Sequence, residues 1–344
     1  MNREKNKKLT IALTYNKKRS PKEGELEDLY AEFDTDQTIN AVKNAIESKG
    51  SDVILIEADE DAFLKLKALK NKIDLVFNIA EGIRGDARES HIPAFCEMLN
   101  IPHTASSALT LAITLDKART KEILSYSNIA TPKFQVFNNE NEKLNADLNF
   151  PLIVKPLREG SSKGIRNNNI VASEKELRSK IKELIENYRQ PAIAEEFIEG
   201  REFTAAVIEN GSQKVLPLVE ITFDYLPKHI KKIDSYEVKW IYDNPNSKID
   251  PLVCPAKLDK ETEDKIKKIS LDAFNALGCK DWCRIDIRLD KKGIPKVLEV
   301  NALPGIMPDP KENSRLPKAA YAAGMSYDQL INIIVDNAIE RHNI

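Results

Sequence analysis

The sequence predicts an α/β protein of three domains whose C-terminal part is α+β. Short apolar runs that alternate with helical patterns open the chain, and strands of alternating polar and apolar residues dominate its last part. With 344 residues the chain is long enough for two or three domains. The predicted domains are an open parallel sheet in residues 1–105, a small central α+β domain in 106–200 and an antiparallel sheet in 201–344.

Composition and charge are those of an ordinary globular protein, with 42% hydrophobic and 31% charged residues and a net charge of −2. Without a basic excess, nucleic acid is not expected as a partner, while a local cationic pocket for one nucleotide stays open. The basic residues in 1–8 precede no apolar run of signal-peptide length, and no run approaches the roughly 20 residues of a membrane-spanning helix. We therefore expect a cytoplasmic protein with no membrane partner.

The cysteine and histidine residues do not form a recognisable metal site. Of the four cysteines only Cys279 and Cys283 are close in sequence, and a second pair to complete a zinc site is missing. We interpret all four as buried thiols. His229, beside a candidate active-site segment, is the one histidine that we single out for chemistry.

The first domain is expected to begin with parallel strands. Three short apolar runs bounded by polar residues suit buried strands, at 11–13, 53–56 and 75–77. Between the first two, apolar residues recur at helical spacing from Ile39 to Ile46, with Thr35 or Asp36 as the N-cap and Gly50 as the stop. Ligands of such sheets bind at the carboxyl ends of the strands.

A helix that carries Leu115, Asp116 and Lys117 is expected to open the central domain. The elements expected after it are a strand at 152–155, a helix at 174–188 and a strand at 192–195. Ser173 and Glu176 are placed as a capping box for this helix. For the third domain we expect strands at 203–208 and 215–221, a helix at 260–277 and a hairpin of 285–289 with 296–300 across a turn at 291–293.

This last hairpin carries the most informative pattern. Alternation in its first strand gives one face to Arg284, Asp286 and Arg288. In its second strand it gives one face to Val297, Glu299 and Asn301 and the other to Leu298 and Val300. Asp286, Glu299 and Asn301 can therefore converge, and such oxygen ligands suit Mg²⁺. A surface hairpin with cross-strand ion pairs is the alternative that spacing alone leaves open.

The segment 158–164 is rich in glycine and serine and directly follows a strand that ends in Lys155. Its backbone N–H groups could wrap nucleotide phosphates while the lysine supplies positive charge. The Walker pattern and the Gly-x-Gly-x-x-Gly pattern are both missing, which argues against a P-loop and a dinucleotide-binding fold. Taken alone, the segment also fits an ordinary flexible turn.

Several separated motifs agree with one family. They are Leu115-Asp116-Lys117, Val154-Lys155-Pro156 with Arg158-Glu159-Gly160-Ser161-Ser162, Gly200-Arg201-Glu202-Phe203-Thr204, Cys254-Pro255-Ala256, Leu277-Gly278-Cys279, Arg284-Ile285-Asp286, and Glu299-Val300-Asn301 followed by Pro304-Gly305. Through their order and spacing, residues 107–336 resemble the D-alanine–D-alanine ligase branch of the ATP-grasp superfamily. The resemblance implies an ATP-grasp fold and an ATP-dependent carboxylate–amine ligase that activates an amino-acid carboxylate as an acyl phosphate.

By this resemblance the cofactors are ATP and Mg²⁺, with two magnesium ions and with Mn²⁺ as an alternative metal. Lys117 and Lys155 would hold the ATP phosphates, and the loop of Gly160, Ser161 and Ser162 would fold over them. The hinge against adenine would consist of Glu195, Glu196, Phe197 and Ile198. Glu202 would bind the ribose hydroxyls. The metal ions would be held by Asp286, Glu299 and Asn301.

The catalytic residues that the resemblance implies are Arg284, Gly305, Ser161 and Lys239. Arg284 and the Gly305 N–H would face the oxyanion of the tetrahedral intermediate, where negative charge develops. Lys239 would reach the γ-phosphate from a mobile lid that excludes water from the acyl phosphate. Ser314 would bind the carboxylate of the second substrate.

The first hundred residues and the lid depart from the family pattern. The segment Asn78-Ile79-Ala80-Glu81-Gly82 replaces the histidine-glycine turn of the family, which makes Glu81 and Arg84 candidate substrate contacts. Trp240 stands where the family commonly has tyrosine or phenylalanine, and it is expected to reshape the second-substrate pocket. We therefore expect ordinary ATP-binding residues and altered amino-acid pockets.

An acidic loop at 17–36 follows the first strand, where the family usually has a Gly-Gly turn. Its candidates for binding the first substrate's ammonium group are Glu23, Glu25, Glu27, Asp28, Glu32 and Asp34. For most of them we favour the interpretation of a solvated acidic surface.

The expected partners are small-molecule amino acids and, by the family resemblance, a second copy of the chain in a homodimer. Three alternatives to D-alanyl-D-alanine formation stay open. They are a ligase that makes another dipeptide or a specialised-metabolite amide, a phosphotransferase on the same scaffold, and a non-catalytic ATP-binding or sensory protein.

Overall fold

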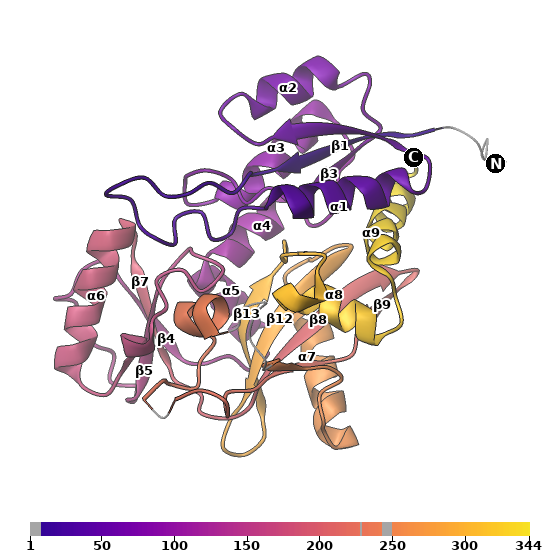
Figure 1. The fold of residues 1–344 in the computed structure, drawn as a ribbon. Helices are drawn as coiled ribbons and strands as arrows, with labels where there is room; N and C mark the ends of the chain where they lie inside the picture. Colours follow the sequence, from indigo (N-terminus) through magenta and orange to yellow (C-terminus); the bar gives the residue numbers. More distant parts are fainter. Residues whose placement is uncertain (1–7, 228, 243–249) are drawn as a thin grey trace.

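The protein, described by a computed structural model, arranges its strands in three separate sheets (Figure 1). The structure describes residues 8–227, 229–242 and 250–344, without the side chains of Asn210, Trp240 and Ile241. The predicted α/β class, with one parallel and two antiparallel sheets, is confirmed. Each sheet lies within one of the three predicted domain ranges, and the domain boundaries themselves stay predictions.

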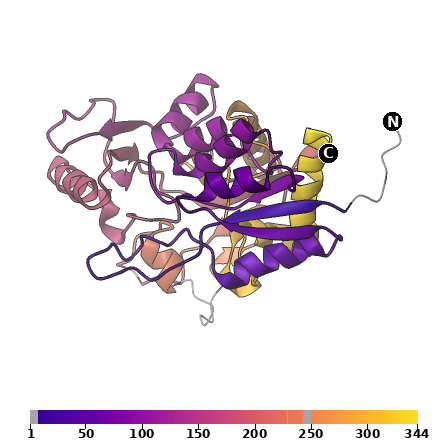
Figure 2. The ribbon, with the colours of Figure 1, turned by 90° about the horizontal axis from the view of Figure 1, so that it is seen from above.

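The N-terminal sheet is parallel, as predicted, with the strand order β2-β1-β3. Its strands and helices are β1 (Thr10–Tyr15), α1 (Asp36–Glu47), β2 (Asp52–Glu57), α2 (Ala62–Leu69), β3 (Leu75–Asn78) and α3 (His91–Leu99). Alternation along β1 sends Ile11 and Leu13 into the core beneath α1, and Ala12 into the core beneath α2 and α3. Helices therefore cover both faces of this sheet (Figure 2). Thr35 caps α1, as expected, by accepting a hydrogen bond from the Thr38 N–H.

Two helices connect this sheet to the central one, so the prediction of one helix through 115–117 is wrong. The helix α4 (Ala108–Leu115) ends at Asp116, whose backbone is extended, and α5 (Lys117–Tyr126) starts directly after it. The Asp116 carboxylate accepts hydrogen bonds from the N–H groups of Ala118 and Arg119. A new helix starts here because a short acidic side chain satisfies its first free N–H groups.

The central sheet is antiparallel, with the strand order β4-β7-β5-β6. Its strands and helix are β4 (Phe134–Phe137), β5 (Leu152–Pro156), β6 (Ile170–Val171), α6 (Glu174–Tyr188) and β7 (Ala192–Glu196). Ser173 caps α6, since its hydroxyl accepts a hydrogen bond from the Glu176 N–H. The predicted capping box is wrong in its second half, because the Glu176 carboxylate accepts from the N–H of Ala172.

The C-terminal sheet has the strand order β11-β10-β8-β12-β13, with β9 also paired to β8. Its strands and helices are β8 (Glu202–Asn210), β9 (Ser212–Val215), β10 (Val219–Ile221), β11 (Leu252–Val253), α7 (Lys260–Ala276), β12 (Trp282–Leu289), β13 (Pro295–Asn301), α8 (Arg315–Ala322) and α9 (Tyr327–His342). The single strand predicted at 215–221 is wrong, because β9 and β10 pair with different halves of β8. Pro217 between them has no N–H with which to continue a ladder.

Four short helical turns complete the described chain. They are η1 (Arg88–Ser90), η2 (Asn167–Asn169), η3 (Val238–Tyr242) and η4 (Pro310–Glu312). The C-terminal helix α9 packs against α1 (Figure 1). Asn332 on α9 donates a hydrogen bond to the carbonyl of Ala45 over 2.8 Å, and Asp336 accepts one from Lys49 over 2.6 Å. The last helix therefore ties the C-terminal sheet to the N-terminal one.

The hairpin of β12 and β13 forms as predicted, but Leu298 is an extra residue on β13. Asp286 pairs with Glu299 and Ile287 pairs with Val297, so Leu298 has no place in the ladder. This bulge leaves both Leu298 and Glu299 lining a pocket, while Val297 is buried in the core. The prediction that Val297 shares a face with Glu299 and that Leu298 faces away is therefore wrong.

All four cysteines are free thiols, as expected, but Cys254 is only partly buried, which corrects the expectation for that residue. Across the described segments, no helix combines the length and the apolar character needed to cross a membrane.

Candidate active site

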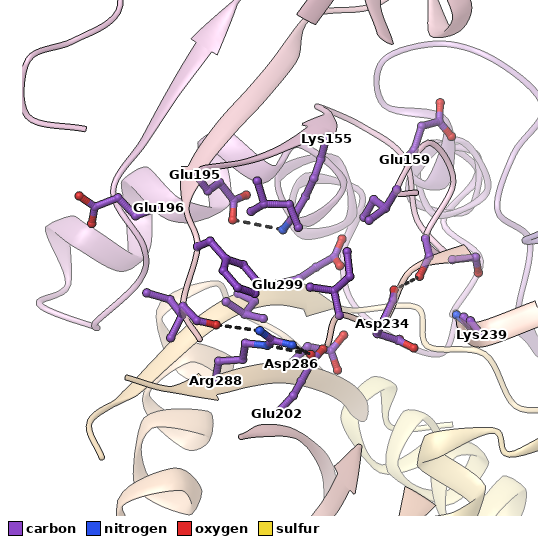
Figure 3. A pocket seen from close by; sticks show the side chains of 18 of the residues that line it. Lys155, Glu159, Glu195, Glu196, Glu202, Asp234, Lys239, Asp286, Arg288 and Glu299 are labelled. Atoms are coloured by element: carbon purple, nitrogen blue, oxygen red, sulfur yellow. Dashed lines mark hydrogen bonds and ion pairs between the residues drawn. The ribbon is translucent and has the colours of Figure 1, made fainter. Parts of the chain in front are cut away.

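A pocket lies between the central and C-terminal sheets (Figure 3). The predicted site residues that line it are Lys155, Ser161, Ser162, Glu195, Glu196, Phe197, Ile198, Glu202, Lys239, Arg284, Asp286 and Glu299. They come from β5, β7, β8, β12 and β13 and from the segments between them. In Figure 3, Lys155 and Glu195 reach the pocket from the central sheet, and Glu202, Asp286 and Arg288 reach it from the C-terminal sheet.

The β12–β13 hairpin brings the three predicted metal ligands together. Its register pairs Asp286 with Glu299 and Arg284 with Asn301. Nδ2 of Asn301 donates to Oδ2 of Asp286 over 3.1 Å. On β8, Thr204 donates its hydroxyl to Oδ1 of the same aspartate over 2.6 Å. Two carboxylates and one amide therefore meet on one side of the cleft.

Two cations pair with these carboxylates. Nζ of Lys117 lies 2.8 Å from Oε1 of Glu299, and Nη2 of Arg284 lies 2.9 Å from Oδ2 of Asp286. Burial by itself would raise the pKa of Asp286, but Arg284 holds that pKa below its usual value. In the part of the chain that the structure describes, no three His, Cys, Asp or Glu side chains are grouped to hold a metal ion. Two ionised carboxylates with the Asn301 amide fit Mg²⁺, whose other ligands are commonly water and phosphate oxygens.

A second group of buried charges lies on the central-sheet side. Oε2 of Glu195, whose side chain is 1% exposed, lies 3.2 Å from Nζ of Lys155 and 3.4 Å from Nζ of Lys121. Burial would raise the pKa of Glu195, yet the two lysines lower it. Burial lowers the pKa of Lys121 to about 8. Oε1 of Glu195 is buried and has no hydrogen-bond partner in the described chain.

Sequence reasoning missed Lys121 as a neighbour of the cleft. Lys121 follows Lys117 by four residues on α5, the spacing at which side chains lie on the same face of a helix. Its amine also donates to the Thr131 hydroxyl and to the carbonyl of Leu298 at the bulge. The spacing was the available signal, but the partners of Lys121 lie on other elements.

Glu202, the predicted ribose ligand, is paired with an arginine to which the sequence analysis gave no role. Arg288 and Glu202 are cross-strand neighbours on β12 and β8, and their charged groups are 2.6 Å apart. Nη1 of Arg288 also donates to the carbonyl of Ile198 in the predicted adenine hinge, over 2.7 Å. The predicted alternation of β12 put Arg288 on the cleft side, but it did not identify these partners.

Residues of the N-terminal domain bind the glycine- and serine-rich segment at 158–164 of the central domain. The Gly160 N–H donates to Oε1 of Glu32 over 2.6 Å, and the Gly164 N–H donates to Oδ2 of Asp28 over 3.0 Å. In this structure, two of the N–H groups expected to wrap nucleotide phosphates therefore bind carboxylates of the protein itself.

Glu32 is the centre of this contact between domains. Its side chain is 4% exposed and lies 2.7 Å from Nζ of Lys163 and 3.0 Å from Nη2 of Arg88. Asp28 is 1% exposed and also accepts a hydrogen bond from the Tyr188 hydroxyl. The interpretation of a solvated surface is wrong for Asp28 and Glu32, because their partners lie on other elements. It is confirmed for the exposed side chains of Glu23, Glu25 and Glu27.

A second cavity adjoins the cleft, since Lys239 and Arg284 line both. It contains Asp34 of the acidic loop, and burial raises the pKa of this carboxyl to about 7. Burial also lowers the pKa of Lys239 to about 8. The buried Nε of Arg284 donates to no atom of the described chain. Ser314 lines the same cavity and donates its hydroxyl to the carbonyl of Gly305 over 2.9 Å.

The two substrate contacts predicted in the N-terminal domain are placed differently. Glu81 lines a third cavity with Asn301, and burial raises its pKa well above the usual value. Glu89, which sequence reasoning missed, lines the same cavity, and burial raises its pKa to about 8. Arg84 lines none of these three cavities. Its guanidinium pairs at the surface with Glu60, 2.7 Å away.

Two further residues singled out from the sequence are not placed in the cleft by the described structure. The side chain of Trp240 lies outside the described part of the chain. His229 is exposed, and its backbone carbonyl accepts a hydrogen bond from Asn167.

The cleft as a whole brings acidic side chains together with several cationic ones. This arrangement is suited to phosphoryl transfer between anionic reactants.

Comparison with known proteins relates this geometry to a family. The family described as D-ala D-ala ligase C-terminus matches residues 123–336. A protein of Sinorhizobium fredii, the uncharacterized protein y4sG, is 35% identical over 309 residues, which are 88% of each chain. The D-alanine–D-alanine ligase of Aquifex aeolicus is 35% identical over 305 residues, which are 87% of this chain and 94% of that one. The chain belongs to the D-alanine–D-alanine ligase family.

The fold of the D-alanine–D-alanine ligase family extends over nearly the whole chain. The crystal structure of the D-alanine–D-alanine ligase from Bacillus anthracis complexed with ATP superposes with a TM-score of 0.72 and 25% sequence identity. The superposition covers 97% of this chain and 99% of that one. The predicted ATP-grasp fold is confirmed. As a member of the D-alanine–D-alanine ligase family, the protein is an ATP-dependent ligase that forms C–N bonds.

Proposed function

We propose that the protein uses ATP to activate the carboxylate of one amino acid as an acyl phosphate and couples it to the amine of a second amino acid. The observation that carries this proposal is the pairing of Asp286 and Glu299 with Arg284 and Lys117 around one cleft. The adjoining cavity offers a carboxylate, Asp34, together with cationic side chains, which suits an amino acid with both charges.

The residues proposed for ATP lie on the central-sheet side of the cleft. Lys155 and Lys117 would bind the phosphates, and Glu195 holds the first of these amines in place. The partnerless Oε1 of Glu195 is an acceptor suited to the amino group of adenine, at the start of the predicted hinge. Unsatisfied buried acceptors are costly, and a ligand that donates a hydrogen bond there removes this cost.

Asp286, Glu299 and Asn301 are the proposed Mg²⁺ ligands, for two ions that Mn²⁺ could replace. When bound, the metal would offset the negative charge of the phosphates and of the substrate carboxylate. Arg284 and Lys117 contribute to the same end, because they add positive charge where two anions must approach each other.

The amino-acid side of the proposal uses the adjoining cavity. Asp34 would accept the ammonium group of the first amino acid, and Ser314 would bind the carboxylate of the second. Arg284, with its unused Nε, and the N–H of Gly305 would face the oxyanion that forms at the acyl carbon. Lys239 would approach the terminal phosphate, whose negative charge would favour the protonated amine.

The proposed reaction has two steps. A carboxylate oxygen of the first amino acid attacks the terminal phosphorus of ATP, and ADP leaves. The amine of the second amino acid then attacks the acyl carbon, inorganic phosphate leaves, and the nitrogen loses a proton to give the amide. The carboxylate becomes reactive because phosphate is a far better leaving group than oxide.

One observation favours a first substrate other than D-alanine. Glu81 and Glu89 line the cavity on the N-terminal side, where the positive charge of Arg88 acts on both of them. Burial raises the pKa of both carboxyl groups. An amino acid with a second ammonium group on its side chain would add positive charge beside these two buried carboxyl groups.

The test is ADP release by the purified protein with Mg²⁺ and pairs drawn from D- and L-alanine, serine, lysine, ornithine and 2,3-diaminopropionate. We expect ADP and phosphate in equal amounts, with an amide product identified by mass spectrometry. A stable phosphorylated product would show that the protein is a phosphotransferase and would contradict the proposed ligase activity. ATP binding without turnover across the whole panel would contradict catalysis.

The location and assembly of the protein are part of the same proposal. We place it in the cytoplasm, where its substrate ATP is available, and we propose a homodimer by analogy with the family. Light scattering on the purified protein would give twice the mass of one chain, and the mass of a single chain would contradict the dimer.

A further inference from the structure

Arg288 is a buried charge of the cleft that the proposed reaction does not use. Its side chain is 3% exposed, yet it lines the proposed ATP pocket from β12 (Figure 3). Its guanidinium lies 5.1 Å from the ring centroid of Phe197 and 5.6 Å from that of Phe223. A cation enclosed in this way needs hydrogen-bond partners in fixed directions.

The guanidinium connects three separate segments. Nε and Nη2 both contact Oε2 of Glu202, at 2.8 and 2.6 Å. Nη1 donates to the carbonyl of Ile198 in the hinge over 2.7 Å. Nη2 also donates to the carbonyl of Lys232, in the segment that leads to Lys239. The planar fork of an arginine can make these contacts at once, whereas the single amine of a lysine cannot.

This arrangement determines which oxygen of Glu202 is available. Because both contacts from Arg288 fall on Oε2, they hold the carboxylate in one orientation and leave Oε1 unused. Among the described residues, Arg288 is the side chain that donates a hydrogen bond to this carboxylate. Glu202 lines the pocket together with the hinge residues Phe197 and Ile198.

We propose that Arg288 is the positioning residue for recognition of the nucleotide ribose. It holds Glu202 so that Oε1 accepts a hydrogen bond from a ribose hydroxyl, and it fixes the hinge to the same point. The inference rests on the proposed binding of ATP in this cleft. Arg288 does not touch the nucleotide and acts through Glu202.

The test compares the dissociation constants of ATP, 2′-deoxyATP and 3′-deoxyATP by calorimetry, with Mg²⁺ and without amino acids. In the native protein we expect one of the deoxynucleotides to bind roughly tenfold to a hundredfold more weakly than ATP, since a hydrogen bond to a carboxylate is lost. Arg288→Gln should bring this ratio close to one, as should Glu202→Gln. Adding Arg288→Gln to Glu202→Gln should leave the ratio unchanged.

Arg201→Gln is the matched control. Arg201 forms a similar pair with Glu220 on the same sheet, at 2.6 Å, but it lies outside the pocket. Arg201→Gln should leave the ratio of the dissociation constants of the deoxynucleotides and ATP as in the native protein. Arg288→Lys keeps the charge without the fork, and it provides the test if Arg288→Gln does not fold.

The outcomes separate this inference from the proposed function. If Arg288→Gln or Arg288→Lys weakened all three nucleotides equally and kept the native ratio, a positioning role toward the ribose would be excluded. A native protein that binds ATP without discriminating among the three would overturn the inference alone. Failure of the native protein to bind ATP at all would overturn the proposed function instead.

Discussion

At the residue scale, the cleft is built from buried charges that compensate one another in pairs. Glu299 pairs with Lys117, Asp286 with Arg284, and Glu195 with two lysines. Replacing one member of such a pair leaves the other buried and uncompensated, which costs more than the pair contributes. Neutral replacements of similar shape are therefore the informative variants at this scale.

Glu299→Gln should lower the rate of ADP release by about 100-fold, the upper end of the effect expected near a metal site. The amide keeps the shape of the side chain but removes the charge that would bind Mg²⁺ and that pairs with Lys117. The measurement is ADP release across a Mg²⁺ titration, with the melting temperature as a check on folding. Glu122→Gln, in an exposed pair with Arg119, is the control and should change nothing. Normal turnover in Glu299→Gln would remove this residue from the metal site.

Asp34→Asn should make the protein more stable at pH 8 and weaken its binding of the first amino acid. Burial raises the pKa of this carboxyl from 3.8 to about 7. Below pH 3.8 the group is protonated in both states and costs nothing. As the pH rises toward 7, the unfolded chain ionises first, so the folded state loses stability in this window.

The measurement for Asp34→Asn is the melting temperature at pH 4 and pH 8. At pH 8 the variant should melt several degrees above the native protein, and at pH 4 the difference should be much smaller. Equal melting temperatures at both values would show that Asp34 is not a desolvated charge.

At the element scale, three local departures from regular structure shape the cleft. Asp116 ends α4 and caps α5, which sets the position of Lys117. The bulge at Leu298 turns Glu299 toward Lys117. Gly200 lets the hinge pass close to the end of β12. Each departure depends on a single residue whose chemistry permits it.

Gly200→Ala should destabilise the hinge by about 1–3 kcal/mol, as expected for overpacking. A β-carbon at this position would lie 1.9 Å from the carbonyl oxygen of Leu289, and a backbone atom cannot move aside cheaply. The measurement is urea unfolding together with the dissociation constant of ATP, which should rise. Gly24→Ala is the comparison, because its left-handed φ of +86° carries a conformational cost with no atom within 4 Å. Unchanged ATP affinity in Gly200→Ala would mean that the hinge does not shape the nucleotide pocket.

At the scale of the whole molecule, two of the contacts that join the N-terminal sheet to the rest involve its first helix and the acidic loop. One is the packing of α9 on α1. The other is the contact of the acidic loop with the segment at 158–164, in which Glu32 binds Arg88, Lys163 and the Gly160 N–H. The second contact places the N-terminal domain directly beside the proposed phosphate-binding loop.

Glu32→Gln should destabilise the protein by about 3 kcal/mol, because it removes one of the two buried carboxylates, Glu32 and Glu159, that Arg88 and Lys163 share. Urea unfolding measures this loss, and limited proteolysis should show cleavage within 158–164. The control is Glu27→Gln, whose exposed pair with Arg166 contributes less than about 1 kcal/mol. Equal stability of the two variants would show that Glu32 does not stabilise the contact between the acidic loop and the segment at 158–164.

The local elements were mostly predictable from sequence. Short apolar runs located the three parallel strands, helical spacing located α1, and alternation located the last hairpin, because each of these patterns reflects which side chains the element buries. The errors fell where a side chain overrode the pattern. Asp116 starts a new helix, Pro217 separates two strands, and Leu298 shifts the phase of β13.

The sequence by itself determined the family, the fold class and the residue types of the cleft, because motifs that are separate in the chain kept their order and spacing. The tertiary structure alone decided which charges meet. Glu32 and Gly160 are 128 positions apart, and Glu202 and Arg288 are 86 positions apart. No local periodicity reports such contacts, because the first depends on how two domains pack together and the second on which strands pair within the C-terminal sheet.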